Sequence, residues 1–539
     1  MIQSRAVIRE DIRRDFRSLF GKQTVHGRSI DVEQTIEMLT RELRPSIAAA
    51  LNARRELLNS RTPVREKYGW PKWDESFEDA TGERRTFRDI VHGMIDNFLG
   101  RDSKLRWRLN ADVPVPADAD PLKNPGLELT GPWQPLDMAF NALNSPAPMN
   151  MPDFEDASPP HFRPEGSPDD EPLGVFSAMR NAREIFNGHW NNQAYEISKK
   201  GKTRSYKINK EPKQWPTRFA RPPSIHVRYQ HVIVEGEPAP RIIVVATLWA
   251  LNNFDALKRA GTGTYFYIPK LQTPREALIV ERLLSRLEEI IGVPAGTMKI
   301  KMLYEEGNAG RTLPAIAWVL RRRLLGTNVG RWDYLGSLIE MWKDDPNGVF
   351  PDPQSIGMAS PNMIAYQRYN ALMMLMAGGA PIGGMAAVMI YQQNDAYGRS
   401  RYNDRALHAM TIDKLRERLL GLVSFEGKTF DLYRQSWVAS PEPSYVAAGN
   451  APLQTPLDRL DLRGLTDAER SLFQSRGLID ANGKLTPRAL KREDIETPEK
   501  IFTQELWDSI YGVPQGDITM EHIQHAFYMA ANYGFQILN

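Results

Sequence analysis

The sequence predicts an α/β fold, a (β/α)8 barrel with a helical region on each side. Two observations support this prediction. Short apolar runs alternate with amphipathic helical segments through the middle of the chain. The runs are almost continuously apolar, which is typical of parallel strands covered on both faces. Eight such runs fit a closed barrel better than an open sheet.

The eight runs define the expected strands, and helices are expected between them. The clearest helices are Phe176–Phe186, Arg275–Ile291 and Asn362–Met376, where apolar residues recur at three- and four-residue spacing. The expected strands lie at residues 148–154, 223–229, 264–270, 297–305, 324–330, 354–360, 381–390 and 435–440.

The domain organisation follows from changes in composition. Residues 1–110 are expected to be helical, with an amphipathic helix pair at 29–61, and 446–539 form a second helical region. The barrel occupies 111–445. Residues 112–125, rich in Pro and Asp, read as a linker, and the alternating segment 195–210 reads as an inserted hairpin that turns at Lys200–Gly201.

Bulk composition excludes several classes of function. The chain has 539 residues, a net charge of +3 and no cysteine, so disulfides, thiolate catalysis and Cys-ligated zinc are excluded. The charge balance gives no reason to expect nucleic acid. Residues 371–391 are uncharged, but glycines and Pro381 favour a buried helix, a turn and a strand from Ile382 over a membrane span. The charged N-terminus is not a secretory signal, and a cytoplasmic location is expected.

Acidic residues follow three of the expected strands. Asp153, Glu155 and Asp156 end the first strand, and Glu305 with Glu306 ends the fourth, while Asp333 follows the fifth. The carboxyl ends of barrel strands meet at one mouth, where clustered carboxylates either bind protons or share a cation. Oxygen ligands suit Mg²⁺, with Mn²⁺ as an alternative. The competing interpretation is that each acid caps the helix that follows it.

Two further features of the expected mouth favour an anionic substrate. Gly330 would let the backbone approach a ligand, and free amides at the start of a helix would bind a small carboxylate. Arg221 would supply a fixed positive charge for a developing oxyanion, or it forms a surface salt bridge. His226, within an expected apolar strand, is interpreted as a core histidine rather than a catalytic one.

At these residues the chain resembles the malate synthases of the shorter, A-type form. The most specific segments are "AGTGTYFYIPKLQTPREA" (260–277) and "GTNVGRWDYLGS" (326–337), and the matches fall in family order over about residues 110–445. The other matching segments are "LELTGPWQPLDMAFNALN" (127–144), "DFEDASPP" (153–160), "RPPSIH" (221–226), "GVPAGTMKIKMLYEE" (292–306), "GGAPIGGMAA" (378–387) and "SWVASP" (436–441).

The resemblance implies a chemistry as well as a fold. Malate synthases condense acetyl-CoA with glyoxylate on Mg²⁺ in a (β/α)8 barrel. The resemblance implies that Glu305 and Asp333 bind the metal and that Arg221 stabilises the enolate. It also implies that the backbone at Gly330, Arg331 and Trp332 cradles the glyoxylate carboxylate. The remaining acids, which are implied to surround the metal and its waters, are Asp153, Glu155 and Asp156.

The sequence departs from the family pattern in three places. The usual "RPRGWH" reads "RPPSIH", and the "GHDGTW" expected before "SWVASP" is replaced by "FDLYRQSW" (430–437). Residues 446–539 contain nothing like the "EDAATAEIS" segment that carries the catalytic aspartate. A second polypeptide, or a neighbouring copy in a homo-oligomer, is therefore expected to complete the site. An aldolase or lyase of the same barrel superfamily and a non-catalytic regulatory or scaffold homologue are the alternatives.

Overall fold

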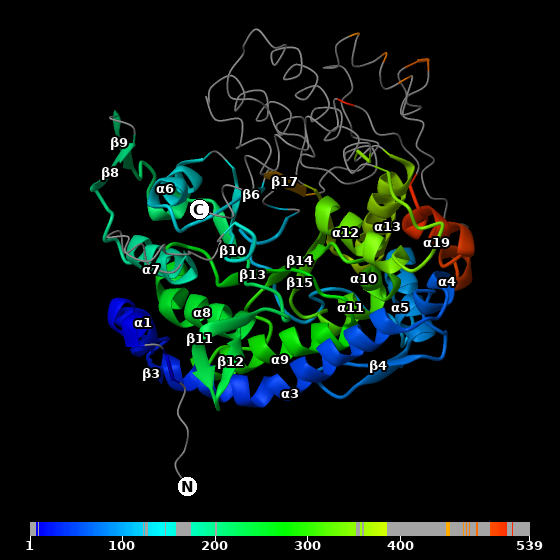
Figure 1. The fold of residues 1–539 in the computed structure, drawn as a ribbon, viewed down its shortest axis with the longest axis horizontal. Helices are drawn as coiled ribbons and strands as arrows, with labels where there is room; N and C mark the ends of the chain where they lie inside the picture. Colours follow the sequence, from blue (N-terminus) through cyan, green and yellow to red (C-terminus); the bar gives the residue numbers. More distant parts are fainter. Residues whose placement is uncertain are drawn as a thin grey trace.

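The computed structural model shows a closed eight-stranded barrel (Figure 1). It describes residues 7–384 with gaps at 9, 122, 124–127, 146, 158–173, 200–201, 352–355 and 358–359. It also describes 449–452, 496–514 and single positions between 467 and 520. Around the barrel the strand order is β10-β13-β14-β15-β16-β17-β6-β7. The strands are β6 (Glu128–Gly131), β7 (Met149–Pro152), β10 (Thr217–Ala220), β13 (Tyr265–Ile268), β14 (Ile300–Tyr304), β15 (Leu324–Val329), β16 (Ala380–Gly383) and β17 (Gly449–Pro452).

The barrel is parallel except at β17, which pairs antiparallel with both of its neighbours. Every residue of β7, β10, β13, β14, β15 and β16 is buried. This explains the mainly apolar composition of most of these strands, because helices cover the outside while side chains fill the inside. The interior is packed by a cluster of buried residues: Ala119, Met149, Met151, Phe219, Tyr265, Tyr267, Leu303 and Leu325.

Five of the expected strands are confirmed, at β7, β13, β14, β15 and β16, with β16 starting two residues before Ile382. The strand expected at 223–229 is wrong. The second position belongs to β10, just before Arg221, because Pro222 and Pro223 have no amide hydrogen with which to continue a ladder. The alternating residues that follow form β11 (Arg228–Val234) in a separate sheet with β1 (Val7–Ile8) and β12 (Glu237–Pro240).

Two expected strands are not found among the described residues, and two barrel strands were not expected. The described residues of 354–360 contain no strand, and 435–440 lies outside the described residues. Two barrel strands, β6 and β17, were not expected. Both are four residues long, and β6 contains Gly131 and two polar residues, so neither has the apolar run that identified the rest.

Helices cover the outside of the barrel (Figure 1). The helices expected from periodicity are confirmed as α7, α9 and α13, each within two residues of the expected bounds. Thr273 caps α9 by accepting a hydrogen bond from the Glu276 amide, and Gly378 ends α13 in the left-handed conformation. The barrel helices are α6 (Leu136–Asn144), α7 (Gly174–Phe186), α8 (Arg241–Arg259), α9 (Pro274–Ile291), α10 (Gly307–Arg311), α11 (Leu313–Val319), α12 (Arg331–Trp342) and α13 (Pro361–Ala377).

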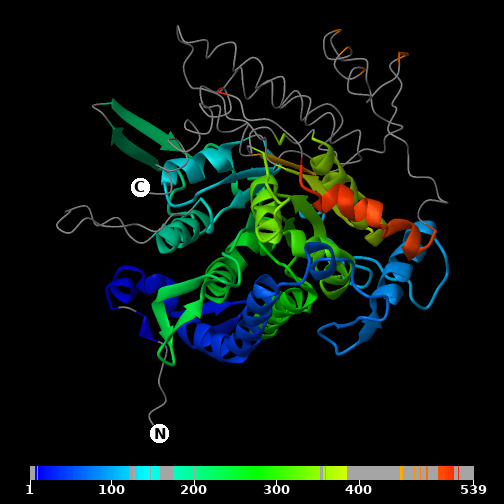
Figure 2. The same cartoon turned by 45° about the vertical axis from the view of Figure 1, so that its right-hand side comes forward.

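The N-terminal region wraps the barrel helices rather than forming a core of its own. Its long helix α3 (Val32–Asn59) lies along α8 and α9 (Figure 2). The helix pair expected at 29–61 is therefore one helix, which continues through Pro45 because its apolar face is held against the barrel helices. The other elements are α1 (Glu10–Asp15), α2 (Arg17–Phe20), β2 (Lys22–Val25), β3 (Arg28–Asp31), α4 (Val64–Lys67), β4 (Ser76–Glu78), β5 (Arg84–Thr86) and α5 (Phe87–Leu99).

Residues 115–119, within the segment 112–125 that was expected to be a linker, pack into the barrel. Ala119 is fully buried in the interior cluster, and Val115 packs against it. Asp118 accepts hydrogen bonds from Thr262, which precedes β13, and from Tyr265, at its first residue. Residues 115–119 therefore close the end of the barrel at which the strands begin.

The remaining described elements lie outside the barrel. The hairpin expected at 195–210 is confirmed as β8 (Ala194–Lys199) and β9 (Lys202–Lys207), and a short 3-10 helix follows at Pro212–Gln214. In the C-terminal region, α18 (Pro498–Ile501) packs on α5 and α19 (Gln504–Tyr511) packs on α13. Among the helices that the structure describes, none combines the length and the hydropathy needed for a membrane span.

Candidate active site at the carboxyl ends of the strands

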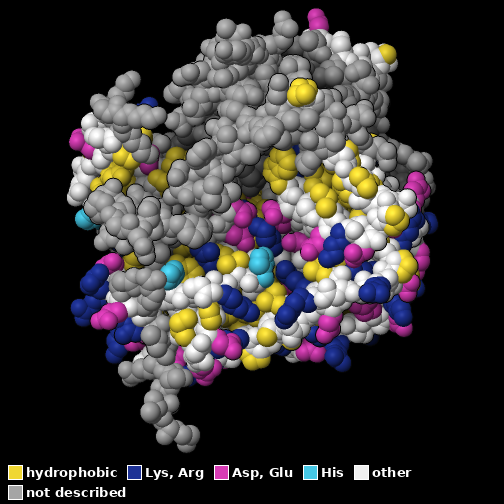
Figure 3. Space-filling view, viewed as in Figure 1, with side chains coloured by type: hydrophobic (Ala, Val, Ile, Leu, Met, Phe, Trp, Pro, Cys, Tyr) yellow, Lys and Arg dark blue, Asp and Glu magenta, His cyan; other side chains and the backbone are white. Residues whose placement is uncertain are grey.

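Five neighbouring strands place charged residues at one end of the barrel. Asp153 follows β7, Arg221 follows β10, Glu305 follows β14, and Asp333 lies in the first turn of α12, after β15. Lys270, two residues after β13, completes the group. Figure 3 shows acidic and basic side chains mixed across the centre of one face of the molecule. The expectation that the acids at these strand ends meet at one mouth agrees with the contacts described next.

Arg221 is the centre of an ion-pair cluster. It is 6% exposed, and its Nη2 donates to Glu155 Oε2 at 2.7 Å and to an oxygen of Asp156. Its Nη1 lies 3.7 Å from Asp153 Oδ2. The backbones of Asp153 and Arg221 form an isolated parallel β-bridge, which fixes this arrangement. The Phe154 amide donates to the Arg221 carbonyl, and the Arg221 amide donates to the Pro152 carbonyl. The alternative that Arg221 forms a surface salt bridge is therefore wrong, because Arg221 is buried.

The three acids around Arg221 have different proton affinities. Burial tends to raise the pKa of Glu155 and Asp156, but the positive charges of Arg221 and Lys270 outweigh burial and hold both pKa values below their ordinary range. The pKa of Asp153 is raised, because burial outweighs Arg221 there. Asp153 also accepts hydrogen bonds from the amides of Glu155 and Ala157, so its carboxylate holds the turn after β7.

Lys270 connects the acids around Arg221 with Glu305 and Asp333. Its ammonium lies 3.0 Å from Glu155 Oε2, 3.2 Å from Asp156 Oδ1 and 3.5 Å from Asp333 Oδ1. Its backbone amide donates to Glu305 Oε1 at 3.0 Å. Its φ of +53° is uncommon for a residue with a side chain, so the surrounding structure must hold this turn in place. Burial opposes its charge, yet Glu305 and the other acids raise the pKa of Lys270.

Glu305 is a buried carboxylate with few hydrogen-bond donors around it among the described residues. It is 2% exposed, and among the described residues the Lys270 amide is its one hydrogen-bond donor. Burial and the negative charge of Asp333 raise the pKa of Glu305 well above its ordinary value. The Asp333 side chain is 37% exposed and faces the Lys270 ammonium. A cation between the two carboxylates would relieve both the burial and the repulsion.

The two carboxylates fit a magnesium site in donor type. Mg²⁺ is usually held by one or two carboxylates, with water and substrate oxygens in the other positions. The described residues contain no group of three or more acidic or histidine side chains arranged as a metal site. The charges of the site favour a cation, because five acids, Asp153, Glu155, Asp156, Glu305 and Asp333, face two bases, Arg221 and Lys270.

Gly330 brings the start of α12 against Glu305. A Cβ on Gly330 would lie 2.8 Å from Glu305 Cβ and 2.9 Å from Glu305 Oε2. The Gly330 amide is not available to a ligand, because it donates to the Tyr366 hydroxyl at 3.1 Å and points to the Tyr304 carbonyl at 3.3 Å. The expectation that the Gly330 amide helps to hold the glyoxylate carboxylate is therefore wrong. The amides left for this role are those that follow, in the first helical turn.

Arg331 and Trp332 begin that turn without any side-chain cap. The Arg331 side chain is 6% exposed and its guanidinium stacks 4.2 Å from the centre of the Trp332 ring. Trp332 is 43% exposed. Both residues lie at the start of α12, where the positive end of the helix dipole favours an anion.

We expect Gly330→Ala to destabilise the protein by about 1–3 kcal/mol, because the added methyl group overlaps Glu305. Gly336→Ala, in the same helix, is the matched control. It meets no atom within 4 Å and should stabilise the protein by about 0.5–1 kcal/mol. Urea unfolding measures both, and equal stability of Gly330→Ala and the parent protein would contradict the close approach.

Glu306 points to a different environment from Glu305. It accepts a hydrogen bond from the Gln272 amide group at 3.0 Å, and burial raises its pKa to about 8. Between pH 4.5 and 8 the folded state holds a proton that the unfolded state has lost. The stability contributed by this proton is complete below pH 4.5 and is lost as the pH rises through 8.

The Glu306→Gln variant should remove that pH dependence. Its stability relative to the parent protein should increase with pH by up to about 1.4 kcal/mol per pH unit between pH 5 and 8. Urea unfolding at several pH values measures the difference. Glu56→Gln, at an exposed position of α3, should give a difference that does not change with pH. A constant difference for Glu306→Gln would contradict the raised pKa.

His226 does not lie in the core, so its interpretation as a core histidine is wrong. It is exposed in the loop between β10 and β11, and its Nδ1 lies 2.7 Å from the Ser224 hydroxyl. The Ser224 amide donates to Glu155 Oε1 at 2.9 Å. Although His226 is exposed, partial loss of solvent around its ring and the nearby positive charge of Arg54 lower its pKa. The segment "RPPSIH" therefore supports Glu155 through a backbone amide.

Sequence reasoning missed two contributors to the site. Lys270 stood at the end of an expected strand, and its position after an apolar run was the available signal. Tyr366 lies in α13, far along the chain, and binds the Gly330 amide through its hydroxyl. No local pattern marks Tyr366, because its role depends on how α13 packs against the start of α12.

Comparison with known proteins identifies the family. The family model described as "Malate synthase, TIM barrel domain" matches residues 217–450. Malate synthase A of Escherichia coli (strain K12) is 30% identical over 447 residues, which cover 80% of this chain and 74% of the relative. The glyoxysomal malate synthase of Ricinus communis is 31% identical over 294 residues, 54% of this chain and 48% of that protein.

A solved structure is also similar. The Haloferax volcanii malate synthase magnesium/glyoxylate complex aligns with 76% of this chain and 97% of its own, at 13% identity and a TM-score of 0.34. The present chain thus spans about half the length of the plant relative and about three quarters of the bacterial one. On the bacterial match, which is extensive in both chains, the protein belongs to the malate synthase family.

Proposed function

We propose that this protein condenses the acetyl group of acetyl-CoA with glyoxylate to form malate, with Mg²⁺ held by Glu305 and Asp333. One observation carries the proposal: Glu305, which is 2% exposed and has one hydrogen-bond donor among the described residues, and Asp333 both contact Lys270 at the barrel mouth, through its amide at 3.0 Å and its ammonium at 3.5 Å. Such a pair is costly unless a cation or a proton joins it. When bound, Mg²⁺ would polarise the aldehyde carbonyl of glyoxylate.

The residues around the pair have distinct proposed roles. The first-turn amides of α12, at Arg331 and Trp332, would hold the glyoxylate carboxylate at the positive end of the helix. Arg221 would face the thioester oxygen as it gains negative charge. Its Nη1 is the nitrogen suited to this role, since its one contact within the described part of the chain is at 3.7 Å to Asp153, while Nε and Nη2 bind Glu155.

The reaction needs a base that removes a methyl proton from acetyl-CoA. The methyl carbon then forms a bond with the aldehyde carbon of glyoxylate, and water hydrolyses the thioester to malate and free CoA thiol. We propose that the proton goes to a carboxylate outside residues 446–539, and a second polypeptide or a neighbouring copy is one source of such a group. The motivation is that residues 446–539 contain no segment like the family's aspartate segment.

Three assays on the 539-residue protein test this proposal. Thiol release should require Mg²⁺, glyoxylate and acetyl-CoA together. Glyoxylate should raise the unfolding temperature only when Mg²⁺ is present, because binding to the folded state alone stabilises it. Exchange of solvent deuterium into the acetyl methyl group reports the base separately. A protein that binds neither Mg²⁺ nor glyoxylate would overturn the proposal, whereas binding without exchange would support a base from another chain.

A further inference from the structure

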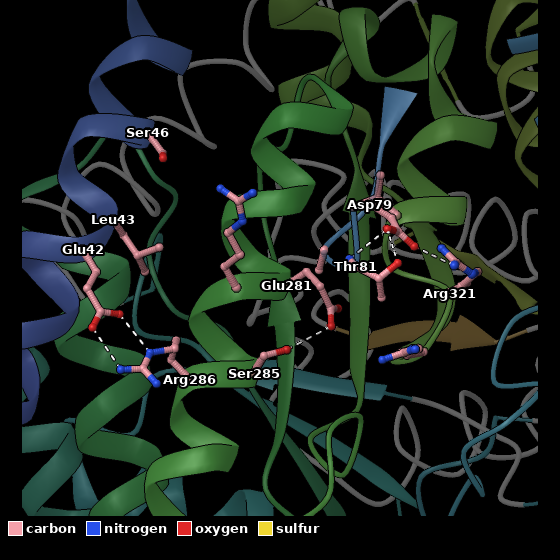
Figure 4. Close-up of a pocket in the computed structure, with 13 residues that line it drawn as sticks. Glu42, Leu43, Ser46, Asp79, Thr81, Glu281, Ser285, Arg286 and Arg321 are labelled. Carbon is pink, nitrogen blue, oxygen red and sulfur yellow. Dashed lines mark hydrogen bonds and ion pairs between the residues drawn. The ribbon is translucent and has the colours of Figure 1, made fainter. Parts of the chain in front are cut away.

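A cavity lies at the other end of the barrel, away from the carboxylate cluster. This cavity of about 320 Å³ opens between α3, the loop joining β4 and β5, α9 and the segment after α11. Figure 4 shows Glu42, Leu43 and Ser46 along α3, across the cavity from Asp79 and Thr81. Arg321 and Arg322 precede β15, whereas Gly330 and Asp333 follow it. At about 3.3 Å per residue, the strand places roughly 20 Å between the cavity and the carboxylate site.

The acids that line this cavity are already neutralised. Glu42 receives Nε and Nη2 of Arg286 at 2.9 and 3.0 Å, and Asp79 receives Arg321 at 2.6 Å (Figure 4). Glu281 pairs at 2.6 Å with Arg323, which is fully buried behind the wall of the cavity. Every lining carboxylate thus has an arginine partner, and none needs a cation from solution.

Two lining arginines have no such partner. Arg282 on α9 and Arg322 before β15 are exposed, and their side chains make no hydrogen bond or ion pair among the described residues. The Ser46 hydroxyl, also in the lining, likewise has no hydrogen-bond partner in the described part of the chain. The lining therefore contains four arginines against three carboxylates, and Arg282, Arg322 and the Ser46 hydroxyl are its polar groups without a side-chain partner in the described part of the chain.

We propose that this cavity binds a small metabolite with two or more negative charges on carboxylate or phosphate groups. The guanidinium plane presents paired donors that match both kinds of oxyanion. A cavity of this volume is at the lower end of the range of small-molecule sites, so the ligand is compact. The site is independent of the proposed condensation, because no residue is shared with the carboxylate cluster.

Titration calorimetry at low ionic strength, without Mg²⁺, tests the proposal on the full chain. The probes are pyrophosphate and succinate, which distinguish phosphate from carboxylate ligands. At least one should bind the parent protein, and Arg282→Ala and Arg322→Ala should each weaken it about tenfold, as expected for the loss of one charge-assisted hydrogen bond. Ser46→Ala should weaken the same probe by a smaller factor.

Arg275→Ala is the matched control. Arg275 lies on the same helix and is exposed and unpaired among the described residues, but it does not line the cavity. Its variant should bind the probe like the parent protein, and the unfolding temperature of each variant confirms that it is folded. Absence of binding of both probes at millimolar concentration would overturn the proposal. An equal loss in Arg275→Ala would do the same, since it would indicate a general effect of surface charge.

Discussion

Glu305→Gln should reduce Mg²⁺ binding below detection in titration calorimetry, and Asp333→Asn should do the same. Each substitution keeps the shape of the side chain and removes one of the two charged ligands proposed for the ion. A single remaining carboxylate, next to the Lys270 ammonium, would have little affinity for Mg²⁺. The effect should be complete because no third acidic or histidine ligand completes a metal site among the described residues.

Stability separates this result from misfolding. Glu305→Gln removes a buried charge, so in urea unfolding without Mg²⁺ it should be at least as stable as the parent protein at neutral pH. Glu56→Gln, an exposed Glu→Gln change on α3, controls for the loss of one negative charge and should bind Mg²⁺ normally. Unchanged affinity in both site variants would remove Glu305 and Asp333 from the metal site.

Arg221→Ala should have the largest effect on stability. Asp153 and Glu155 would remain in place without the guanidinium between them, and breaking a buried ion pair on one side costs about 3–5 kcal/mol. Arg221→Lys should recover part of the loss, since it restores the charge but cannot bind two carboxylates with a planar fork. Any condensation activity should fall in both variants, because the donor facing the thioester oxygen is lost or displaced.

The pH dependence of the stability that Arg221→Ala loses is a second readout. The lowered pKa of Glu155 contributes stability that is present above pH 4.5 and is lost as the pH falls through the pKa of the folded state. Part of that contribution comes from Arg221, so the deficit should be largest near pH 7 and should shrink below pH 4. Arg275→Ala should show no deficit at either pH. A deficit independent of pH would mean that packing, rather than charge, makes Arg221 important.

Much of the barrel could be predicted from the sequence because its strands are buried on both faces. The runs around Tyr265–Ile268 and Ile300–Tyr304 are continuously apolar or aromatic, apart from Lys301, and such runs are recognisable without a structure. The prediction failed where burial and sequence pattern disagree. Strand β10 is only "TRFA", and the apolar alternation after Pro223 belongs to a different sheet.

The candidate site was predictable in its residue types but not in its connections. Glu305 and Asp333 were identified because parallel strands bring their carboxyl ends together. The contacts that organise the site could not be anticipated, because they depend on backbone geometry. The Lys270 amide, in a left-handed turn, donates to Glu305. The Gly330 amide donates to the hydroxyl of Tyr366, which lies in another helix.

Anomalous diffraction from crystals soaked in Mn²⁺ tests the central claim most directly. The claim is that Glu305 and Asp333 hold one divalent ion at the carboxyl ends of β14 and β15. It predicts a single strong anomalous peak at the barrel mouth, within about 2.0–2.3 Å of an oxygen of each carboxylate. A mouth without a peak, in which the Lys270 ammonium alone bridges the acids, would contradict it.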